Sequence, residues 1–442
     1  MQRALPKRCS QGAQPKRGRC ARIGHMTLLA QDLHLHVEGN TIRLNPRDPH
    51  FYNNPYPYYA VMRALPQPFY WADFDLWCFA RWEDVNALLR DRRFGRQILH
   101  LRTREELGLP PIPEELAFFY EVDNATMIQM EPPDHTRLRS LVQKAFMARQ
   151  IEGLRPRIQA LCDQLIDQML EQGEVDLLTA YATPIPVITI AHMLGVPTEM
   201  SEHLLNWSHA MVAMYELGRT REQELRAVQA TREFYAYVQQ LVAERRRHPT
   251  DDLITRLIEA EEQGQKLTEH ELISSTMQLL NAGHEATVNV IGNGVYALLT
   301  HPDQWAKLVA DPTLSRTAVE ELLRFDTPLH LFTRWVLEAL EYRGHRFAFG
   351  EVVALLLGSA NRDPERFPHA DTLDITRADN PHVAFGGGIH FCIGAPLARL
   401  ELDIALSTLA RRAPKLELLE QPEYRNAYHF HGLKSLRVRV AA

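Results

Sequence analysis

The sequence predicts a mainly α-helical fold with a smaller β-rich part, an α+β arrangement that forms one integrated domain. Three observations lead to this prediction. Between about residues 134 and 323, apolar residues recur every three or four positions, which is the period of an amphipathic helix. Shorter apolar runs with turn residues precede this body at residues 46–98, and β-type residues return at residues 333–357. The sequence contains no internal repeat or low-complexity linker that would divide these parts.

The helices are predicted from apolar periodicity and from glycine and proline signals. Trp82–Arg90 is expected to form a helix after a strand of alternating residues at Asp75–Ala80. In the main body, one helix face consists of Ile158, Leu161, Leu165, Ile166 and Met169. Gly195 and Pro197 mark the end of another helix. A long periodic segment from Leu272 to Leu299 predicts a long helix.

The second β-rich region and the C-terminal tail are predicted from turn residues. Between Thr333 and Leu357 we expect strands with a turn at Arg343-Gly344. We expect Tyr428–Val440 to form a hairpin around Gly432.

The composition excludes several classes of protein. The formal net charge is −6, which disfavours nucleic-acid binding because phosphate contacts need a surplus of Lys and Arg. No apolar run approaches the ~18 residues of a membrane span. Five cysteines without a CxxC pair argue against a disulfide framework and a structural zinc site. We therefore expect a cytoplasmic monomer in which Cys78 and Cys162 are small buried apolar residues.

The first 31 residues differ from the rest of the chain. They contain seven Lys or Arg and no acidic residue, and they lack the apolar stretch of a secretory signal. We interpret residues 1–31 as a disordered basic tail, or as an over-extended start with Met26 as the true initiator. Residues 32–442 are then the single domain.

The segment FGGGIHFCIGAP, residues 385–396, carries the most chemical information. Three consecutive glycines permit close backbone approach and unusual dihedral angles. Pro396 suits the first turn of a helix, so Cys392 is expected on a tight loop before a helix N-terminus. Backbone N–H groups and the helix dipole at that position stabilise a thiolate. A thiolate held in this way suits axial ligation of haem iron.

These residues resemble the haem-binding signature FGxGxHxCxG of the cytochrome P-450 family. Three further segments agree with the family in order and spacing: Glu321–Arg324 with its ExxR, Asn361–Arg377 with the meander, and Pro132–Arg139 with the helix at the haem edge. The resemblance implies the cytochrome P-450 fold and the cofactor haem b (iron protoporphyrin IX). It makes Cys392 the iron ligand, with Phe385, Gly386 and Gly394 around the cofactor. It also implies the soluble bacterial type, which receives electrons from ferredoxin and ferredoxin reductase.

The resemblance assigns the haem propionates to four cationic side chains. These are His135, Arg139, Arg334 and His390. The i, i+4 spacing of the first two places them on one helix face. The resemblance also implies a buried structural network of Glu321, Arg324 and Arg377. This network is expected to stabilise residues 385–394, which we call the cysteine loop.

The long helix contains AGHEAT, residues 282–287, which resembles the family's AGxETT motif. Ala282 and Gly283 would let the helix lie against the macrocycle, and Glu285 would relay protons. The family's usual threonine after the acid is Ala286 here, whereas Thr287 matches the motif's second threonine. A substrate hydroxyl, an ordered water or a rearranged Thr287 could replace the missing alcohol. Alternatively, oxygen activation is poorly coupled or uses peroxide.

His284 and Glu285 could also begin the zinc-protease motif HExxH. The second histidine of that motif is missing, because residue 288 is valine. We therefore reject a protease-type zinc site and expect His284 to face away from the haem.

By resemblance, variable loops over the distal face would form the substrate pocket. The candidate pocket residues are Phe118, Met127, Met211, His330, Phe332 and Phe430. Together they indicate a small to medium hydrophobic substrate with one or two polar groups. Four basic residues could form the ferredoxin-docking face, or simply a solvated charged face: Arg137, Lys144, Arg149 and Arg399.

Three functions are consistent with these motifs. The first is a haem-thiolate monooxygenase that uses O2 and electrons from a ferredoxin-type partner. The second is a peroxide-driven oxidation, suggested by Ala286. The third is a non-catalytic haem sensor, against which Glu285 and the pocket loops argue.

Overall fold

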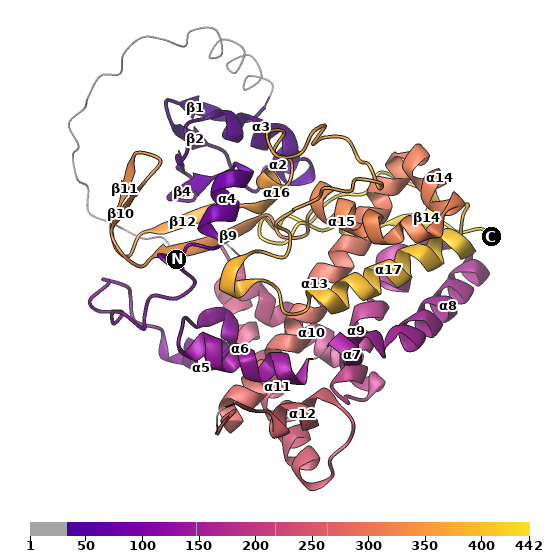
Figure 1. Ribbon diagram of the computed structural model, residues 1–442, viewed down its shortest axis with the longest axis horizontal. Helices are drawn as coiled ribbons and strands as arrows, with labels where there is room; N and C mark the ends of the chain where they lie inside the picture. Colours follow the sequence, from indigo (N-terminus) through magenta and orange to yellow (C-terminus); the bar gives the residue numbers. More distant parts are fainter. Residues whose placement is uncertain (1–32, 147, 217, 263) are drawn as a thin grey trace.

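A computed structural model describes residues 33–146, 148–216, 218–262 and 264–442 (Figure 1). Its strands are β1 (His36–Glu38), β2 (Thr41–Arg43), β3 (Phe69–Trp71), β4 (Leu76–Phe79), β5 (Phe94–Gly95), β6 (Glu174–Asp176), β7 (Glu261–Glu262), β8 (Gln265–Lys266), β9 (Leu331–Val336), β10 (Leu340–Tyr342), β11 (His345–Phe347), β12 (Val352–Leu356), β13 (Glu417–Leu418) and β14 (Arg437–Arg439). The basic tail and Met26 lie outside the described residues.

The helices make up most of the described chain. They are α2 (Pro49–Asn53), α3 (Tyr56–Ala64), α4 (Trp82–Leu88), α5 (Ala117–Asn124), α6 (Asp134–Ala145), α7 (Ala148–Glu152), α8 (Arg155–Gln172), α9 (Pro184–Met193), α10 (Ser201–Val212), α11 (Arg221–Arg247), α12 (Leu253–Glu259), α13 (Glu269–Thr300), α14 (Pro302–Ala310), α15 (Ser315–Phe325), α16 (Leu357–Ala360) and α17 (Ala395–Arg412). The predicted α+β class is confirmed.

One seven-stranded sheet joins the two β-rich segments of the sequence. Its order is β1-β2-β3-β4-β12-β9-β5, and it lies at the upper left of Figure 1. Strand β12 pairs in parallel with β4 and antiparallel with β9, so that Ala354 faces Cys78 on one side and Thr333 on the other. This pairing places Arg334 on β9 in the interior of the sheet.

Helix α13 runs through the helical body and is covered on most of its surface. Thr268 caps its first turn, and its side chain and that of Glu271 satisfy each other's backbone N–H groups. It contacts α9, α10, α11 and α17. Because so many neighbours cover it, residues on nearly all of its sides are buried, among them Ile273, Val290 and Val295.

The sequence predictions for local structure were confirmed except at the C-terminus. The predicted helices correspond to α4, α8, α9 and α13, and Arg343-Gly344 forms the turn between β10 and β11 with positive φ angles of 52° and 76°. The hairpin around Gly432 was wrong. The chain reverses earlier, because residue 425 pairs with residue 432 and residue 434 with residue 423. Strand β14 instead pairs with β13 and β6.

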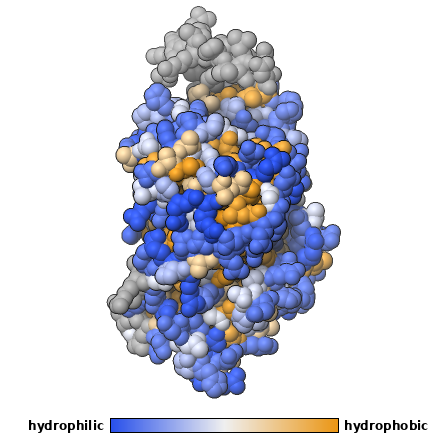
Figure 2. Space-filling view, turned by 90° about the vertical axis from the view of Figure 1, so that its right-hand side faces the viewer, coloured by the Kyte–Doolittle hydropathy of each residue, from blue (hydrophilic) through white to orange (hydrophobic). Residues whose placement is uncertain are grey.

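The described cysteines agree with the sequence analysis. Cys78 and Cys162 are fully buried, and both are free, as is Cys392. In the described ranges, no helix has the length and apolar character needed to cross a membrane. Figure 2 shows the face that carries the C-terminus, which is mainly hydrophilic with small hydrophobic clusters.

Candidate functional site: a cysteine loop facing a long helix

The cysteine loop runs from the meander to the first turn of α17. Gly386 and Gly388 have φ angles of +70° and +66°, which L side chains rarely adopt. A Cβ on Gly388 would lie 2.4 Å from the carbonyl oxygen of Leu89, so the loop approaches the end of α4 through bare backbone. The Cys392 N–H donates to the Phe385 carbonyl at 3.0 Å. These constraints hold Cys392 just before the N-terminus of α17.

The pKa of the Cys392 thiol is subject to opposing effects. Burial raises this pKa, while the N–H groups of Gly394 and Ala395 and the charge of Arg139 lower it. Burial dominates, so the pKa of the thiol is above its usual value. Cys392 nevertheless keeps accessible surface. A metal ion bound there would deprotonate the thiol.

Basic side chains gather beside this loop from three elements. His135 is 2 % exposed, and neither of its ring nitrogens has a hydrogen-bond partner among the described residues. Its ring lies 4.5 Å from that of His390, and burial lowers the pKa of His135 to about 4. Arg139, one turn along α6, donates to the Phe391 carbonyl at 2.7 Å.

The guanidinium of Arg334 on β9 is also buried with few hydrogen-bond partners. Arg334 is 3 % exposed and donates to the carbonyl of the neighbouring Thr333. Burial lowers the pKa of Arg334 to about 9, helped by the charge of Arg96. The charge of Glu131, which accepts from His390 at 3.4 Å, opposes this lowering. Buried cations with unpaired donors are costly, so the site fits an anionic group such as the two haem propionates.

The ExxR residues form a buried network behind the loop. Arg324 donates twice to Glu321, at 2.8 Å each, and also to the carbonyl groups of Asn361 and Ala370. Arg377 donates to the same carboxylate at 3.0 Å. Glu321 and Arg324 are both 0 % exposed. The three predicted members therefore lie together, and they hold the meander against α15.

A second ion-pair cluster, which the sequence analysis missed, connects α15 directly to α17. Glu320 accepts from Arg399 at 2.6 Å and from His382 at 3.0 Å. The Arg399 guanidinium lies 4.6 Å from the centre of the Phe385 ring. The one sequence signal was that Glu320 directly precedes the ExxR motif, but its partners lie more than 60 residues away.

The residues of the distal motif, residues 282–287, lie on different sides of α13. Ala282 is exposed and Ala286 half-buried, although the intervening His284 and Glu285 are buried. A Cβ on Gly283 would meet Ile190 of α9 at 3.3 Å, so its missing side chain makes room for α9. The role expected for Gly283 beside the macrocycle stays a prediction. Ala282 and Ala286 remain on the open side of the helix.

The distal acid and alcohol are both engaged within the protein. Glu285 pairs with Arg425 at 2.8 Å and with His209 of α10 at 3.2 Å. Burial opposes ionisation, but the bond from His209 and the charge of Arg425 lower the pKa of Glu285 to about 2. The Thr287 hydroxyl lies 3.4 Å from the Gly283 carbonyl one turn back. Sequence spacing could not reveal either partner of Glu285.

A cavity of about 290 Å³ opens beside Glu285. Its lining comes from α10 and the turn that follows it, from α13 and from the C-terminal segment. It consists of His209, Val212, Ala213, Glu216, Glu285, Arg425, Asn426, Ala427 and Phe430. Of the candidate pocket residues, only Phe430 contributes to the lining of this cavity. The cavity therefore combines apolar groups with ionised ones.

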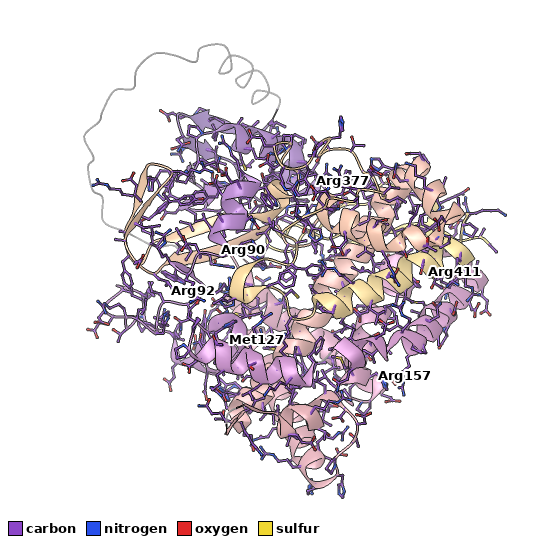
Figure 3. The ribbon with its side chains drawn as sticks, viewed as in Figure 1. Arg90, Arg92, Met127, Arg157, Arg377 and Arg411 are labelled. Atoms are coloured by element: carbon purple, nitrogen blue, oxygen red, sulfur yellow. The ribbon has the colours of Figure 1, made fainter. Side chains whose placement is uncertain are left out.

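The other candidate pocket residues are mostly packing residues. Met211 and Met127 are buried, and Met211 accepts from Asn281 on α13; Figure 3 shows Met127 near α5 and α6. Phe118 packs edge-on against Tyr235 of α11.

His330 needs a correction, whereas the pocket role of Phe332 stays a prediction. The His330 side chain is 1 % exposed and bonds the Tyr59 hydroxyl at 2.7 Å, so it belongs to a buried polar cluster rather than to a pocket. Phe332, half-buried, packs on Gly386 of the cysteine loop.

The residues expected to form a basic face are partly neutralised. Arg137 pairs with Glu271, and Arg399 pairs with Glu320. Lys144 is exposed, and the side chain of Arg149 lies outside the described part. Figure 3 labels two further arginines, Arg90 and Arg92, and both are exposed. Arg90 lies against Gly387 and Gly388 of the cysteine loop, and Arg92 follows it two positions later.

Comparisons with known proteins agree with this geometry. The family model described as Cytochrome P450 matches residues 115–413. Cytochrome P450 107B1 of Saccharopolyspora erythraea is 42% identical over 378 residues, which cover 83% of this chain and 90% of that protein. The polyketide biosynthesis cytochrome P450 PksS of Bacillus subtilis is 38% identical over 411 residues, 90% of this chain and 99% of that one. The solved structure of P450BioI in complex with hexadec-9Z-enoic acid ligated acyl carrier protein has a TM-score of 0.83 at 36% identity, covering 89% of this chain and 100% of that chain.

Proposed function

The chain belongs to the cytochrome P450 family, and we propose that this monooxygenase oxidises a small to medium apolar molecule with O2 and with electrons from a ferredoxin. The family fold and the haem-iron cofactor follow from membership. One observation carries the finer proposal: an accessible cysteine lies on the loop before α17, beside basic side chains that are buried with few partners. Arg334 donates to a single carbonyl, and neither ring nitrogen of His135 has a hydrogen-bond partner among the described residues.

Haem b would supply the oxidising chemistry, and the Cys392 sulfur would hold its iron. His135, Arg139, Arg334 and His390 would hold the two propionates, because charge-assisted hydrogen bonds to carboxylates compensate their burial. Gly394 and Ala395 would donate N–H groups to the sulfur and tune its electron donation. Ala282 would leave space over the distal face.

Proton delivery is where this chain departs from its family. Glu285 is ionised and paired with Arg425 and His209, so it must exchange these partners before it can pass a proton inward. Ala286 offers no hydroxyl, and Thr287 bonds its own helix. We propose that water or a substrate hydroxyl takes the place of the alcohol. Comparing product formed with reductant and ferredoxin against product formed with peroxide alone tests this against a peroxide-driven reaction.

The substrate class is supported by the cavity and by relatives. The cavity beside α13 combines apolar lining with Arg425 and Glu216, which suits an apolar molecule with one or two polar groups. PksS is named for polyketide biosynthesis, and the P450BioI structure contains a fatty acid on a carrier protein. A compound library of polyketides and fatty acids, screened for the substrate-induced shift of the haem Soret band, tests this class.

The redox partner is proposed to dock beside the cysteine loop. Arg90 and Arg92 are exposed there and would attract an acidic ferredoxin (Figure 3). Arg92→Glu should slow reduction by ferredoxin, most strongly at low salt. The control is Arg411→Glu, because Figure 3 places Arg411 at the far end of α17. Equal rates for both variants would contradict docking at this face.

The iron ligand has a direct test. Cys392→Ser should abolish the red-shifted Soret band of the reduced protein with carbon monoxide bound. The reason is that a serine oxygen donates far less electron density to iron than a thiolate does. Persistence of that spectrum would show that another residue binds the iron. The free Cys78, Cys162 and Cys392 suit a reducing compartment, and we propose a cytoplasmic monomer.

A further inference from the structure

Three side chains from two helices converge at the edge of the cavity beside α13. They are His209 on α10 and the adjacent His284 and Glu285 on α13. Each offers a ligand atom, and the three atoms lie within 4.8 Å of one another. The His209 Nε2 lies 3.2 Å from a carboxylate oxygen of Glu285, and the two imidazole rings are 5.8 Å apart. Two imidazoles and one carboxylate are a ligand set that zinc commonly uses.

The neutral ring of His284 has one nitrogen, Nε2, whose lone pair is available to bind a metal ion. His284 is only 3 % exposed, and Nδ1 lies 3.1 Å from the carbonyl oxygen of Leu280. A carbonyl accepts a hydrogen bond, so Nδ1 carries the proton and Nε2 keeps its lone pair. Nε2 is buried and has no partner among the described residues. Metal-binding histidines are oriented in the same way, by a hydrogen bond from the other nitrogen to a carbonyl.

The surroundings favour a cation and leave room for a further ligand. The cavity lining contains the carboxylates of Glu216 and Glu285 against the single guanidinium of Arg425. Arg425 contacts one oxygen of Glu285, and His209 faces the other. An ion can therefore replace the hydrogen bond to His209 while Arg425 stays in place. The open cavity admits a water molecule as the fourth ligand.

We propose that His209, His284 and Glu285 form a binding site for a divalent transition-metal ion, with zinc as the best fit. Imidazole ligands select such ions over calcium or magnesium, which prefer oxygen ligands. A bound ion would cross-link α10 to α13 at the edge of the cavity. Since Glu285 is also the proton-relay acid of the proposed function, the ion would compete with proton delivery.

Two other clusters place three ligand atoms equally close but are weaker candidates. Asp326, His330 and His431 are fully buried, and Asp326 already accepts from the hydroxyl groups of Tyr56 and Tyr424. His34, Asp48 and His50 lie largely at the surface, where binding would be weak. The second cluster can still contribute background binding and is removed from the test protein.

The test is a Zn²⁺ titration of the full-length, haem-loaded protein that carries His34→Gln. Free Zn²⁺ is followed with a competing colorimetric chelator. Against this parent, His209→Gln and His284→Asn should each lose one bound equivalent, or weaken it at least 10-fold. His203→Gln is the matched control, because His203 is exposed on the same helix and lies outside the cluster, and it should bind like the parent.

Since His209 is 54% exposed in its side chain, His209→Gln should fold normally, and this variant decides the question if His284→Asn is unstable. Zn²⁺ should also raise the melting temperature of the parent and of His203→Gln more than that of His209→Gln. If His209→Gln binds as many equivalents as tightly as the parent, the proposal is wrong. The haem spectrum of each variant reports separately on the proposed function, so failure of the two proposals can be distinguished.

Discussion

Replacing Arg324 should destabilise the protein far more than replacing a surface arginine in the same local arrangement. Arg324→Ala removes two bonds to Glu321 and the donors to the carbonyl groups of Asn361, Ala370 and Thr372. The remaining carboxylate is 0 % exposed. Breaking one partner of a buried ion pair costs about 3–5 kcal/mol, a large part of the ~5–15 kcal/mol that stabilises a typical domain.

The chain contains a matched control for this prediction. Glu152 and Arg155 have the same i, i+3 spacing, but their side chains are 63% and 38% exposed. Arg155→Ala should therefore cost no more than ~0.5 kcal/mol. The two pairs share residue types and spacing, although Glu152 ends α7 and Arg155 begins α8. They differ in burial and in the three carbonyl groups that only Arg324 reaches.

The assay is urea unfolding of the haem-loaded variants, followed by intrinsic fluorescence and by the Soret band. If Arg324→Ala does not fold, Glu321→Gln keeps the shape of the side chain and should still cost about 3 kcal/mol, because it leaves the Arg324 charge uncompensated. A difference below ~1 kcal/mol between the buried and the surface variants would refute the argument from burial.

Three further outcomes are expected. Ala286→Thr should increase the product formed per reductant consumed several-fold, and an unchanged ratio would show that the missing hydroxyl does not limit coupling. Arg334→Ala should speed haem loss to apomyoglobin about 10- to 100-fold, the equivalent of ~1.5–3 kcal/mol for one charge-assisted hydrogen bond; an unchanged rate would remove Arg334 from the propionate site. Burial raises the pKa of Glu320, but Arg399 and His382 together lower it to about 2 from 4.5. A carboxyl with a lowered folded-state pKa stabilises the fold above its unfolded pKa, so the free energy of unfolding should fall between about pH 4.5 and 2, and Glu320→Gln should flatten that slope.

Local patterns predicted the helices well because the information lies within each segment. The face of α8 with Ile158, Leu165, Ile166 and Met169 is buried in the core, as its spacing indicates. The hairpin around Gly432 failed because strand pairing depends on partners elsewhere. Strand β14 pairs with β6, which lies about 260 residues away in the sequence. No local turn signal contains that information.

The partners of individual side chains were harder to predict than the elements that carry them. Glu321 and Arg324 are neighbours on one helix, so their pairing follows from spacing. Glu285 pairs with Arg425, 140 positions later, and with His209 on another helix. His330 lies on the chain next to pocket candidates, yet its ring packs inward against Tyr59.

The sequence by itself determined the class of this protein: helical periodicity, a glycine-lined cysteine before a helix and the ExxR pair are all local and chemically specific. Only the tertiary structure decided which cations lie beside the cysteine, which residues restrain Glu285, and that Gly283 makes room for α9. The physical reason is that hydrogen bonds and charge interactions act over a few ångströms in space, whereas their partners are tens to hundreds of residues apart in the chain. Folding sets those distances, and with them the burial of side chains such as His135 and Arg334.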